Sequence, residues 1–107
     1  MPHSYCVIST TAGSQAEAEH LANVLVQERL AACVQISQVF SVYTWEETLH
    51  KEKEWLLLIK TRAELYEQVE GALHALHSYE TPEIICMPII QGSVPYLAWI
   101  DENTKDA

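Results

Sequence analysis

The residues most able to do chemistry in this 107-residue sequence lie in one short stretch, from His77 to Glu83. An imidazole, the phenol of Tyr79 and the carboxylates of Glu80 and Glu83 fall within these seven residues. Because Pro82 disfavours a helical conformation at the residue before it, the stretch is predicted to be a loop between two elements. Loops held by rigid elements often carry binding sites. An ordinary solvent-exposed turn has the same composition, so both interpretations fit.

His77 also offers the chemistry of a metal ligand. His74 and His77 are three residues apart at the expected end of a helix, so their imidazoles can point to the same side. Helical histidine pairs bind transition metals, and Glu80 or Glu83 would supply an oxygen ligand. Polar side chains also suit a helix C-terminus for electrostatic reasons that need no metal. His77 is therefore a candidate metal ligand, with a structural role as the alternative.

The remaining residues give no sign of an activated nucleophile or of a bound cofactor. No serine lies in a recognisable nucleophile elbow, and three glycines are too few for a phosphate-binding loop. Cys6, Cys33 and Cys86 are far apart among apolar neighbours, which is typical of reduced, buried thiols rather than of disulfides or a zinc site. We predict neither an enzymatic activity nor an obligatory cofactor.

Composition and charge argue against several classes of partner. Fifteen acidic side chains against six Lys and Arg give a formal net charge of −9, which disfavours binding to nucleic acids. No apolar run approaches the ~20 residues that a membrane span needs. No basic segment precedes an apolar one at the N-terminus, as it would in a signal peptide. We expect a cytoplasmic protein without nucleic-acid or membrane partners.

The first half of the chain is predicted to form a strand, a helix and a second strand. Residues 4–10 are rich in β-branched and aromatic types. Ser14 stands three residues before Glu17, the spacing of a capping box, and apolar residues then recur with a helical period. Residues 34–43 alternate between apolar and polar, which predicts a strand, bent or bulged around 37–38.

The second half is predicted to repeat this order. Its expected elements are an exposed hairpin end at 46–54, a strand at 55–60, a helix capped by Thr61 and Glu64 and reaching Leu76, a strand at 83–90, a short helix at 94–100 and a frayed tail at 101–107. The resulting β-α-β-β-α-β order predicts an α+β, ferredoxin-like sandwich with two helices on one face of a four-stranded antiparallel sheet, plus a short C-terminal helix. We expect residues 1–107 to form one domain.

The second face of the predicted sheet is apolar, although no helix is expected to cover it. The strands at 55–59 and 84–90 are apolar on both faces, yet two helices cover only one face. Leaving Leu57, Ile59 and Ile85 uncovered would create an apolar patch of the kind that monomers avoid. Covering several such side chains contributes on the order of several kcal/mol, at ~25 cal/mol per Å². A closed homo-oligomer is therefore expected.

Aromatic residues near the hairpin suggest a ligand cleft. If the hairpin closes between residues 46 and 54, the rings of Trp45 and Trp55 are expected to approach each other across the strands. Together with Lys60, Tyr79 and Glu83, Trp45 could then line a small cleft for an anionic or aromatic ligand. Aromatic packing beneath the hairpin is the alternative interpretation.

Five segments of the chain resemble the CutA family, the divalent-cation tolerance proteins. They are Arg29–Val34, Tyr43–Glu46, Leu58–Thr61, His77–Glu83 and Tyr96–Trp99. The resemblance covers nearly the whole chain, with the segments in the family's order and spacing. It implies a ferredoxin-like fold in a homotrimer similar to the PII signalling proteins, a cytoplasmic location, and a link to tolerance of copper and other divalent metals. Members of the family have no established enzymatic reaction.

This chain departs from the family pattern at the residues linked to copper. The copper site of some members resembles a first-strand Cys with a His-His pair, and the matching positions here are Thr10, Leu76 and His77. Only His77 is retained, so weak copper binding is expected because a lone imidazole without a thiolate is a poor chelator. Ser78 replaces a proline that would stiffen the turn, and Glu47 replaces a hairpin glycine.

Two functional hypotheses follow from the resemblance and the residues. The first is a CutA-type tolerance protein that responds to metal ions, with copper or another divalent cation as ligand. The second is a PII-like trimer that senses a small molecule or binds a protein partner, with Trp45, Lys60, Tyr79 and Glu83 around the ligand and only an indirect metal link. The missing ligands at Thr10 and Leu76 weaken the first hypothesis relative to the second.

Overall fold

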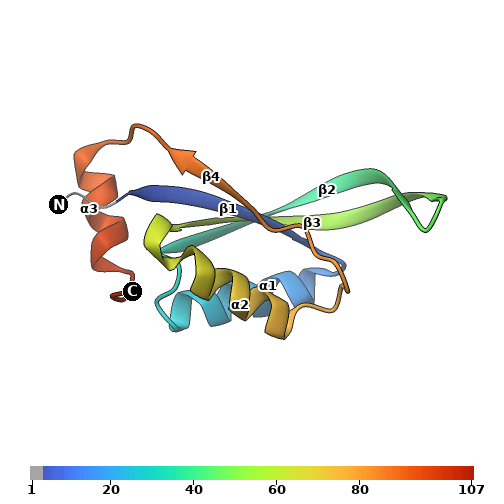
Figure 1. The fold of residues 1–107 in the computed structure, drawn as a ribbon, viewed down its shortest axis with the longest axis horizontal. Coiled ribbons are helices and arrows are strands. Elements are labelled where there is room, and N and C mark those ends of the chain that lie inside the picture. The colour runs from blue at the N-terminus through green and yellow to red at the C-terminus, as the bar shows by residue number, and fades with distance from the viewer. Residues whose placement is uncertain (1–3) are drawn as a thin grey trace.

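The computed structural model describes residues 4–107, which form a four-stranded antiparallel sheet with two helices packed against one face (Figure 1). The elements are β1 (Tyr5–Ala12), α1 (Gln15–Gln27), β2 (Cys33–Trp45), β3 (Thr48–Arg62), the 3₁₀ turn η1 (Ala63–Leu65), α2 (Tyr66–Leu76), β4 (Ile85–Ile89) and α3 (Val94–Glu102). The strand order is β2-β3-β1-β4. This order confirms the predicted ferredoxin-like fold.

The core lies between the sheet and the helices α1 and α2. Side chains alternate along a strand, so every second residue of β1 and β3 points to the helices. The residues buried there include Ile8, Leu57 and Ile59 from the strands and Leu21 and Leu73 from the helices, all without exposed surface. The sequence placed Leu57 and Ile59 on the uncovered face, and that prediction is wrong. Strand alternation instead places them against the helices.

The start of α1 follows the predicted capping pattern, whereas the start of α2 does not. The backbone N–H of Glu17 donates to the Ser14 hydroxyl at 3.1 Å. Thr61, the predicted cap of the second helix, is part of β3, and its hydroxyl donates to the carbonyl of Leu30 at 2.6 Å. Pairing between β1 and β3 continues through Arg62, so the helix cannot begin at Thr61.

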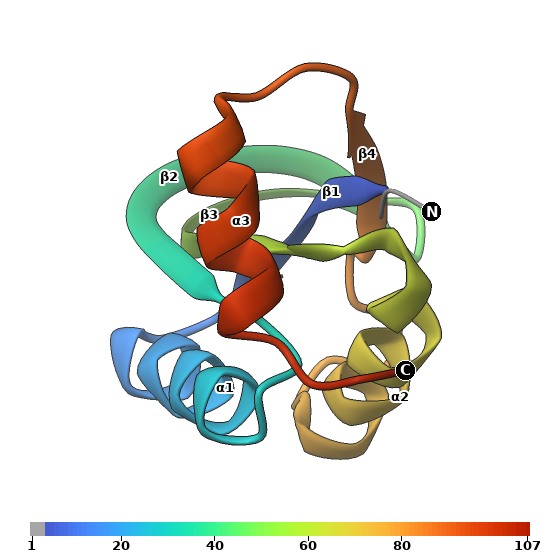
Figure 2. The ribbon, with the colours of Figure 1, turned by 90° about the vertical axis from the view of Figure 1, so that its left-hand side faces the viewer.

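The β2–β3 hairpin is longer and more regular than predicted. Its register runs without interruption from Cys33 opposite Lys60 to Trp45 opposite Thr48, so no bulge interrupts β2 at residues 37–38. The predicted exposed hairpin end at 46–54 is instead a two-residue turn followed by strand. The hairpin extends past the ends of α1 and α2 and is strongly curved (Figures 1 and 2).

The register also separates the two tryptophans that were expected to meet. Trp45 lies opposite Thr48 at the turn, whereas Trp55 lies opposite Gln38 near the middle of the hairpin. The expected pairing of these rings is therefore wrong. The physical reason is the short turn. It places Thr48 opposite Trp45, whereas the longer loop that the sequence suggested would have placed Trp55 there, seven residues further along the chain.

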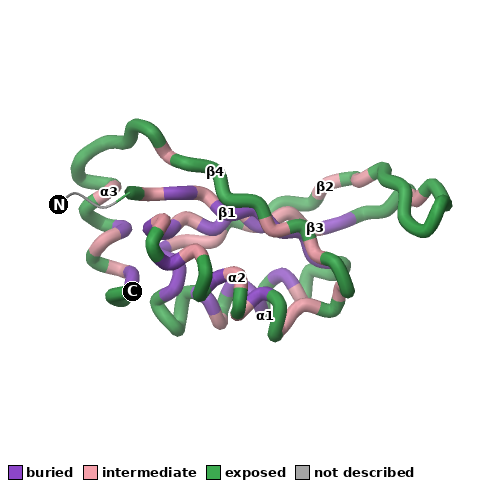
Figure 3. Tube along the Cα trace, in the orientation of Figure 1, coloured by how far each residue is buried: buried purple, intermediate pink, exposed green. Residues whose placement is uncertain are grey.

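The sheet face that turns away from α1 and α2 carries apolar side chains. Leu56 and Leu58 are half-buried there, and Ile85 and Met87 of β4 keep 51% and 42% of their surface exposed. Figure 3 shows β4 as a largely exposed strand. Helix α3 covers only one end of this face, where Tyr5 donates a hydrogen bond to Asp101 at 2.7 Å. The predicted uncovered apolar face exists, although with different residues from β3.

The C-terminal tail is held in place rather than frayed, contrary to the prediction. The backbone N–H of Lys105 donates to the carbonyl of Arg29 at 2.8 Å. Thr104 is buried, and its hydroxyl accepts a hydrogen bond from Nε of Arg62 at 2.9 Å. The polar composition of the tail suggested fraying, but these polar groups have partners on distant elements. Figure 2 shows the tail running back from α3 across the end of the molecule.

The hairpin turn has an unfavourable backbone conformation that a single substitution should relieve. Glu46 and Glu47 have φ values of 51° and 64°, in the left-handed region where a side chain is disfavoured. We predict that Glu47→Gly raises the free energy of unfolding by up to about 1 kcal/mol, because glycine adopts this conformation without a steric penalty. Urea unfolding at a fixed protein concentration measures the change.

The matched control is Glu47→Ala, which removes the charge but keeps the Cβ atom. We expect it to give little of the gain that Glu47→Gly gives. An equal gain in both variants would assign the effect to repulsion between Glu46 and Glu47 and would contradict backbone strain as its cause.

Candidate functional site

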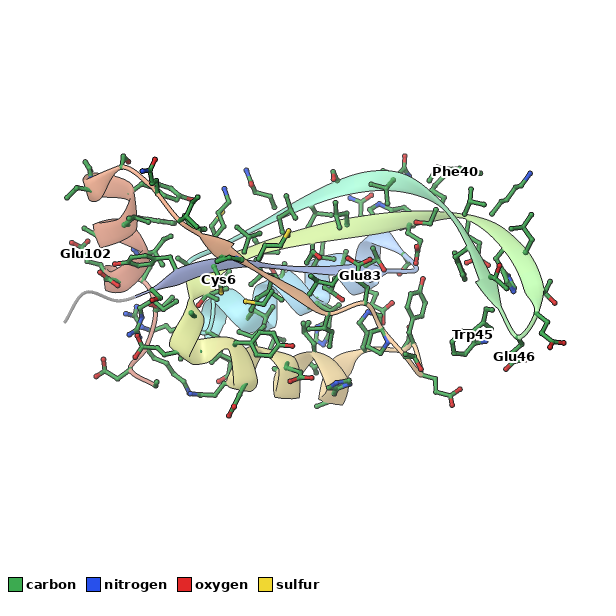
Figure 4. The ribbon with its side chains drawn as sticks, turned by 45° about the horizontal axis from the view of Figure 1, so that its top comes forward. Cys6, Phe40, Trp45, Glu46, Glu83 and Glu102 are labelled. Atoms are coloured by element: carbon green, nitrogen blue, oxygen red, sulfur yellow. The ribbon has the colours of Figure 1, made fainter. Side chains whose placement is uncertain are left out.

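Three of the four residues predicted to line a cleft lie around one cavity. Trp45, Tyr79 and Glu83 line a cavity of about 650 Å³ between the hairpin and the loop that precedes β4. In Figure 4, Trp45 lies near the hairpin turn and Glu83 lies close to the sheet. The polar loop at 77–83 therefore faces the hairpin, so its side chains do not form an isolated surface turn.

Lys60, the fourth predicted residue, does not line this cavity. It lies at the other end of β3, opposite Val7 and Cys33, and its Nζ is 5.6 Å from the centre of the Tyr96 ring. Twelve strand residues separate it from the hairpin turn, which corresponds to roughly 40 Å at about 3.3 Å per residue. Within one chain, Lys60 therefore cannot contact a ligand that is bound beside Trp45.

Glu54 is a residue of the cavity that the sequence did not reveal. Its side chain is 6% exposed, and its Oε2 accepts a hydrogen bond from the Tyr79 hydroxyl at 2.8 Å. Burial, followed by this hydrogen bond and the negative charge of Glu54, raises the pKa of Tyr79 above its ordinary value. The signal that could have found Glu54 is strand alternation, which places it on the same face as Leu56 and Leu58.

The other carboxylates and aromatic rings set the chemistry of the cavity. Glu83 accepts a hydrogen bond from the Ser9 hydroxyl at 2.8 Å, which holds the loop to β1. Glu80 and Tyr43 complete an acidic and aromatic lining, and neither Lys nor Arg is among the residues that line the cavity. The cavity is therefore suited to an aromatic or positively charged group.

His77 is engaged in the structure of the loop through both of its ring nitrogens. Its side chain is fully buried, and Nε2 lies 2.6 Å from the carbonyl oxygen of Thr11. The backbone N–H of Tyr79 donates to Nδ1 at 3.0 Å, so the proton of the neutral ring belongs on Nε2, which donates to Thr11. A metal at His77 would have to displace one of these hydrogen bonds.

His74, the expected partner of His77 in a metal site, has a different environment. His74 is half-exposed on α2, where its Nε2 lies 3.5 Å from a carboxylate oxygen of Glu70. Within residues 4–107, no three His, Cys, Asp or Glu side chains are grouped in a way that could hold a metal ion. His77 therefore acts as the contact that fixes the loop to β1.

Glu17 of α1 is the second residue that the sequence did not connect with this loop. Its carboxylate accepts hydrogen bonds from the backbone N–H of Ser78 at 2.8 Å and from the Ser78 hydroxyl at 3.0 Å. Burial alone would raise the pKa of Glu17, but the hydrogen bonds from Ser78 and Gly13 and the nearby His77 ring together lower it. Ser78 thus ties the turn to α1 through an N–H that the proline of the family pattern lacks.

The family model of the CutA1 divalent ion tolerance protein matches residues 6–103, which is nearly the entire chain. The chain belongs to the CutA1 divalent ion tolerance family. This membership confirms the resemblance that the sequence motifs indicated.

Individual relatives support the same assignment. The divalent-cation tolerance protein CutA of Thermus thermophilus is 40% identical over 99 residues, covering 92% of this chain and 96% of the relative. The chloroplastic protein CutA of Arabidopsis thaliana is 42% identical over 101 residues, covering 94% of this chain but only 56% of the longer plant protein. The solved structure of the periplasmic divalent cation tolerance protein CutA of Archaeoglobus fulgidus has a TM-score of 0.92 and 39% identity, covering 94% of this chain and 99% of that one.

The relatives differ in the compartments that their names give, which are the chloroplast in one case and the periplasm in another. The expected cytoplasmic location of the CutA chain is therefore a prediction that these relatives do not support. Within residues 4–107, no helix is both long and apolar enough to cross a membrane.

The Tyr79 hydroxyl is predicted to stabilise the fold in a pH-dependent manner. Tyr79→Phe removes the donor to the buried carboxylate of Glu54, and should lower the free energy of unfolding by about 1–3 kcal/mol. The pKa of Tyr79 is raised in the folded protein, so its contribution is present in full below the unfolded pKa of about 10 and is lost as the pH rises through the folded pKa. Urea unfolding of both proteins from neutral to alkaline pH measures the difference.

Tyr43→Phe is the matched control, because the Tyr43 hydroxyl donates to Glu52 at 3.0 Å in an exposed pair. We expect a much smaller loss of stability from this variant. Equal losses in the two variants would contradict the special role of the hydrogen bond from Tyr79 to the buried Glu54.

Proposed function

We propose that this CutA protein serves divalent-cation tolerance as a binding protein rather than an enzyme, and that the cavity beside Tyr79 is its ligand site. The names of the Thermus and Archaeoglobus relatives support the link to divalent-cation tolerance. The single observation that carries the choice of site is the cavity itself, where Glu54, Glu83 and three aromatic rings converge from the hairpin and the loop.

Direct copper binding at the family's motif positions is proposed to be weak in this chain. Both nitrogens of His77 are hydrogen-bonded, and Leu76 offers no ligand. Thr10 lies buried in β1 and supplies a hydroxyl in place of a soft thiolate. The metal link of this protein is therefore proposed to be indirect or to involve residues outside these positions.

The cavity favours the second candidate function, binding of a small molecule in the manner of PII proteins. Because its lining lacks a basic side chain, it supports an aromatic or positively charged ligand over an anionic one. The anionic ligand expected from the sequence depended on Lys60, which lies at the far end of β3. Lys60 would reach a ligand only if it came from another copy of the chain.

A homotrimer is proposed as the working form of the protein, with the apolar sheet face as its interface. Ile85 and Met87 lie exposed on that face beside Leu56 and Leu58. An apolar patch of this kind is typical of a face that is covered in the assembled protein. The cytoplasm is the proposed location, on the grounds of composition alone.

Copper titration tests the role of His77. We predict that the parent binds Cu(II) weakly, with a dissociation constant above the micromolar range, and that His77→Gln binds no more weakly than the parent. Glutamine keeps one donor and one acceptor, so it is the variant best able to preserve the contacts of the buried ring. Isothermal titration calorimetry measures the affinity, and thermal unfolding verifies that the variant is folded.

The control for this titration is His74→Gln, which changes the exposed histidine of the same helix end. Tight copper binding that survives in His74→Gln but disappears in His77→Gln would contradict the structural role assigned to His77.

Sedimentation tests the proposed trimer. At micromolar concentration the parent is expected to sediment with about three times the 12.1 kDa mass of the chain. Met87→Glu places a charge on the proposed interface and should dissociate the assembly. Val26→Glu is the matched control, because Val26 has the same exposed fraction, 42%, on the surface of α1. A monomeric parent, or an equal effect of the two variants, would overturn this interface.

A further inference from the structure

Two of the three cysteines, which the sequence separates by eighty residues, meet on the edge of the sheet. In the antiparallel pairing of β1 with β4, Cys6 lies opposite Pro88 and Cys86 lies opposite Ile8. Cys6 and Cys86 are therefore diagonal neighbours on the face that packs against the helices. Burial, followed by a hydrogen bond with Cys86 and its charge, raises the pKa of the Cys6 thiol to about 12.

The two thiols differ in how easily a reagent can reach them. Cys6 is 1% exposed within the core, whereas Cys86 is exposed at the edge of the sheet. Cys86 also lies near Tyr66 of α2, whose pKa is raised by burial and then by the charges of Glu70 and Cys86. The pair thus combines an exposed cysteine with a cysteine that lies in the apolar core.

The third cysteine is not part of this pair. Cys33 is on β2 and lies opposite Lys60. Two strands separate it from β4 in the sheet order β2-β3-β1-β4. It is half-buried and free, and so provides an internal control for the chemistry of the other two.

The diagonal arrangement favours a bridging atom over a direct disulfide. Diagonal neighbours in an antiparallel sheet have Cα atoms about 7–8 Å apart, beyond the 4.4–6.8 Å that a disulfide usually spans. A metal ion adds about 2.3 Å between itself and each sulfur, and so joins two thiolates that a direct S–S bond of about 2 Å would strain.

The number of available ligands restricts the kind of ion. Within residues 4–107, no group of three or more His, Cys, Asp or Glu side chains could hold a metal, so only the two sulfurs are on offer. Zinc sites use three or four protein ligands, whereas soft thiolates select ions such as Cu(I). A soft monovalent ion with low coordination therefore fits this pair better than a divalent ion does.

We propose that Cys6 and Cys86 form a two-thiolate binding site for a soft monovalent cation of the Cu(I) type. The site lies on the helix face of the sheet, whereas the neighbouring Met87 of the proposed trimer interface points to the opposite face, and neither cysteine lines the cavity at Tyr79. It does not depend on either of those proposals. One cation binds two sulfurs and displaces the proton of each, with no change of oxidation state.

Access and proton release follow from the environments of the two thiols. The ion meets Cys86 first, because that thiol is exposed, and then displaces the proton of buried Cys6. Metal affinity at a thiol site rises with pH because each ligand must lose its proton. The binding constant is therefore expected to increase as the pH rises.

The test is an anaerobic titration of the reduced protein with Cu(I) in competition with a chromophoric Cu(I) chelator. The parent should take up one Cu(I) per chain. Cys86→Ser should lower the affinity by at least about 100-fold, because the loss of a ligand should cost no less than the roughly 10–100-fold that the loss of a partner hydrogen-bonded to a ligand costs. Cys33→Ser should bind like the parent, because β3 separates the strand of Cys33 from that of Cys6, and both β3 and β1 separate it from that of Cys86.

Cys6→Ala should also lose Cu(I) binding, and thermal unfolding verifies that this variant is folded. Because Cys6 lies in the core, its replacement could disturb folding, whereas Cys86 is exposed, so Cys86→Ser tests the site without changing the core. Affinity that persists in Cys86→Ser, that falls equally in Cys33→Ser, or that does not change with pH would overturn the proposal.

Discussion

The pairing of β3 along both of its edges determines where the other parts of this molecule lie. β2 pairs with β3 along nearly its whole length, and β1 pairs with its second half. Because side chains alternate along a strand, Leu57 and Ile59 enter the core while Glu54 and Lys60 face the other side. A single strand therefore connects the hairpin that forms one wall of the cavity with the helical core that supports it. The same strand places Lys60 beside α3, far from that cavity.

The loop before β4 depends on this frame through several polar contacts. Its contacts are those of His77 with Thr11, Ser78 with Glu17, Tyr79 with Glu54, and Glu83 with Ser9. Each one joins the loop to a different position on β1, α1 or β3. The side chains that looked most reactive in the sequence thus hold the loop in place. The surface that faces the cavity is acidic and aromatic, and such a surface is better suited to binding a ligand than to catalysis.

The order of elements could be predicted because the signals for strands and helices are encoded locally. A capping spacing at Ser14, the helical period of α2 and the apolar runs of β3 and β4 are visible within short windows of sequence. Errors occurred where distant contacts decide the outcome. Thr61 resembles a helix cap, but its pairing with Cys6 across the sheet keeps it in β3. The polar tail resembles a frayed end, but Thr104 meets Arg62 from the middle of the chain.

The sequence by itself determined the family, the ferredoxin-like order of strands and helices, and three of the residues that line the cavity, namely Trp45, Tyr79 and Glu83. Only the tertiary structure decided that Glu54 pairs with Tyr79, that Lys60 lies elsewhere, and that Cys6 meets Cys86. The physical reason is that periodicity along the chain records which side of an element is apolar. Which residues face each other across two strands depends on their register, and the register is set by packing of the whole core and by the length of the hairpin turn.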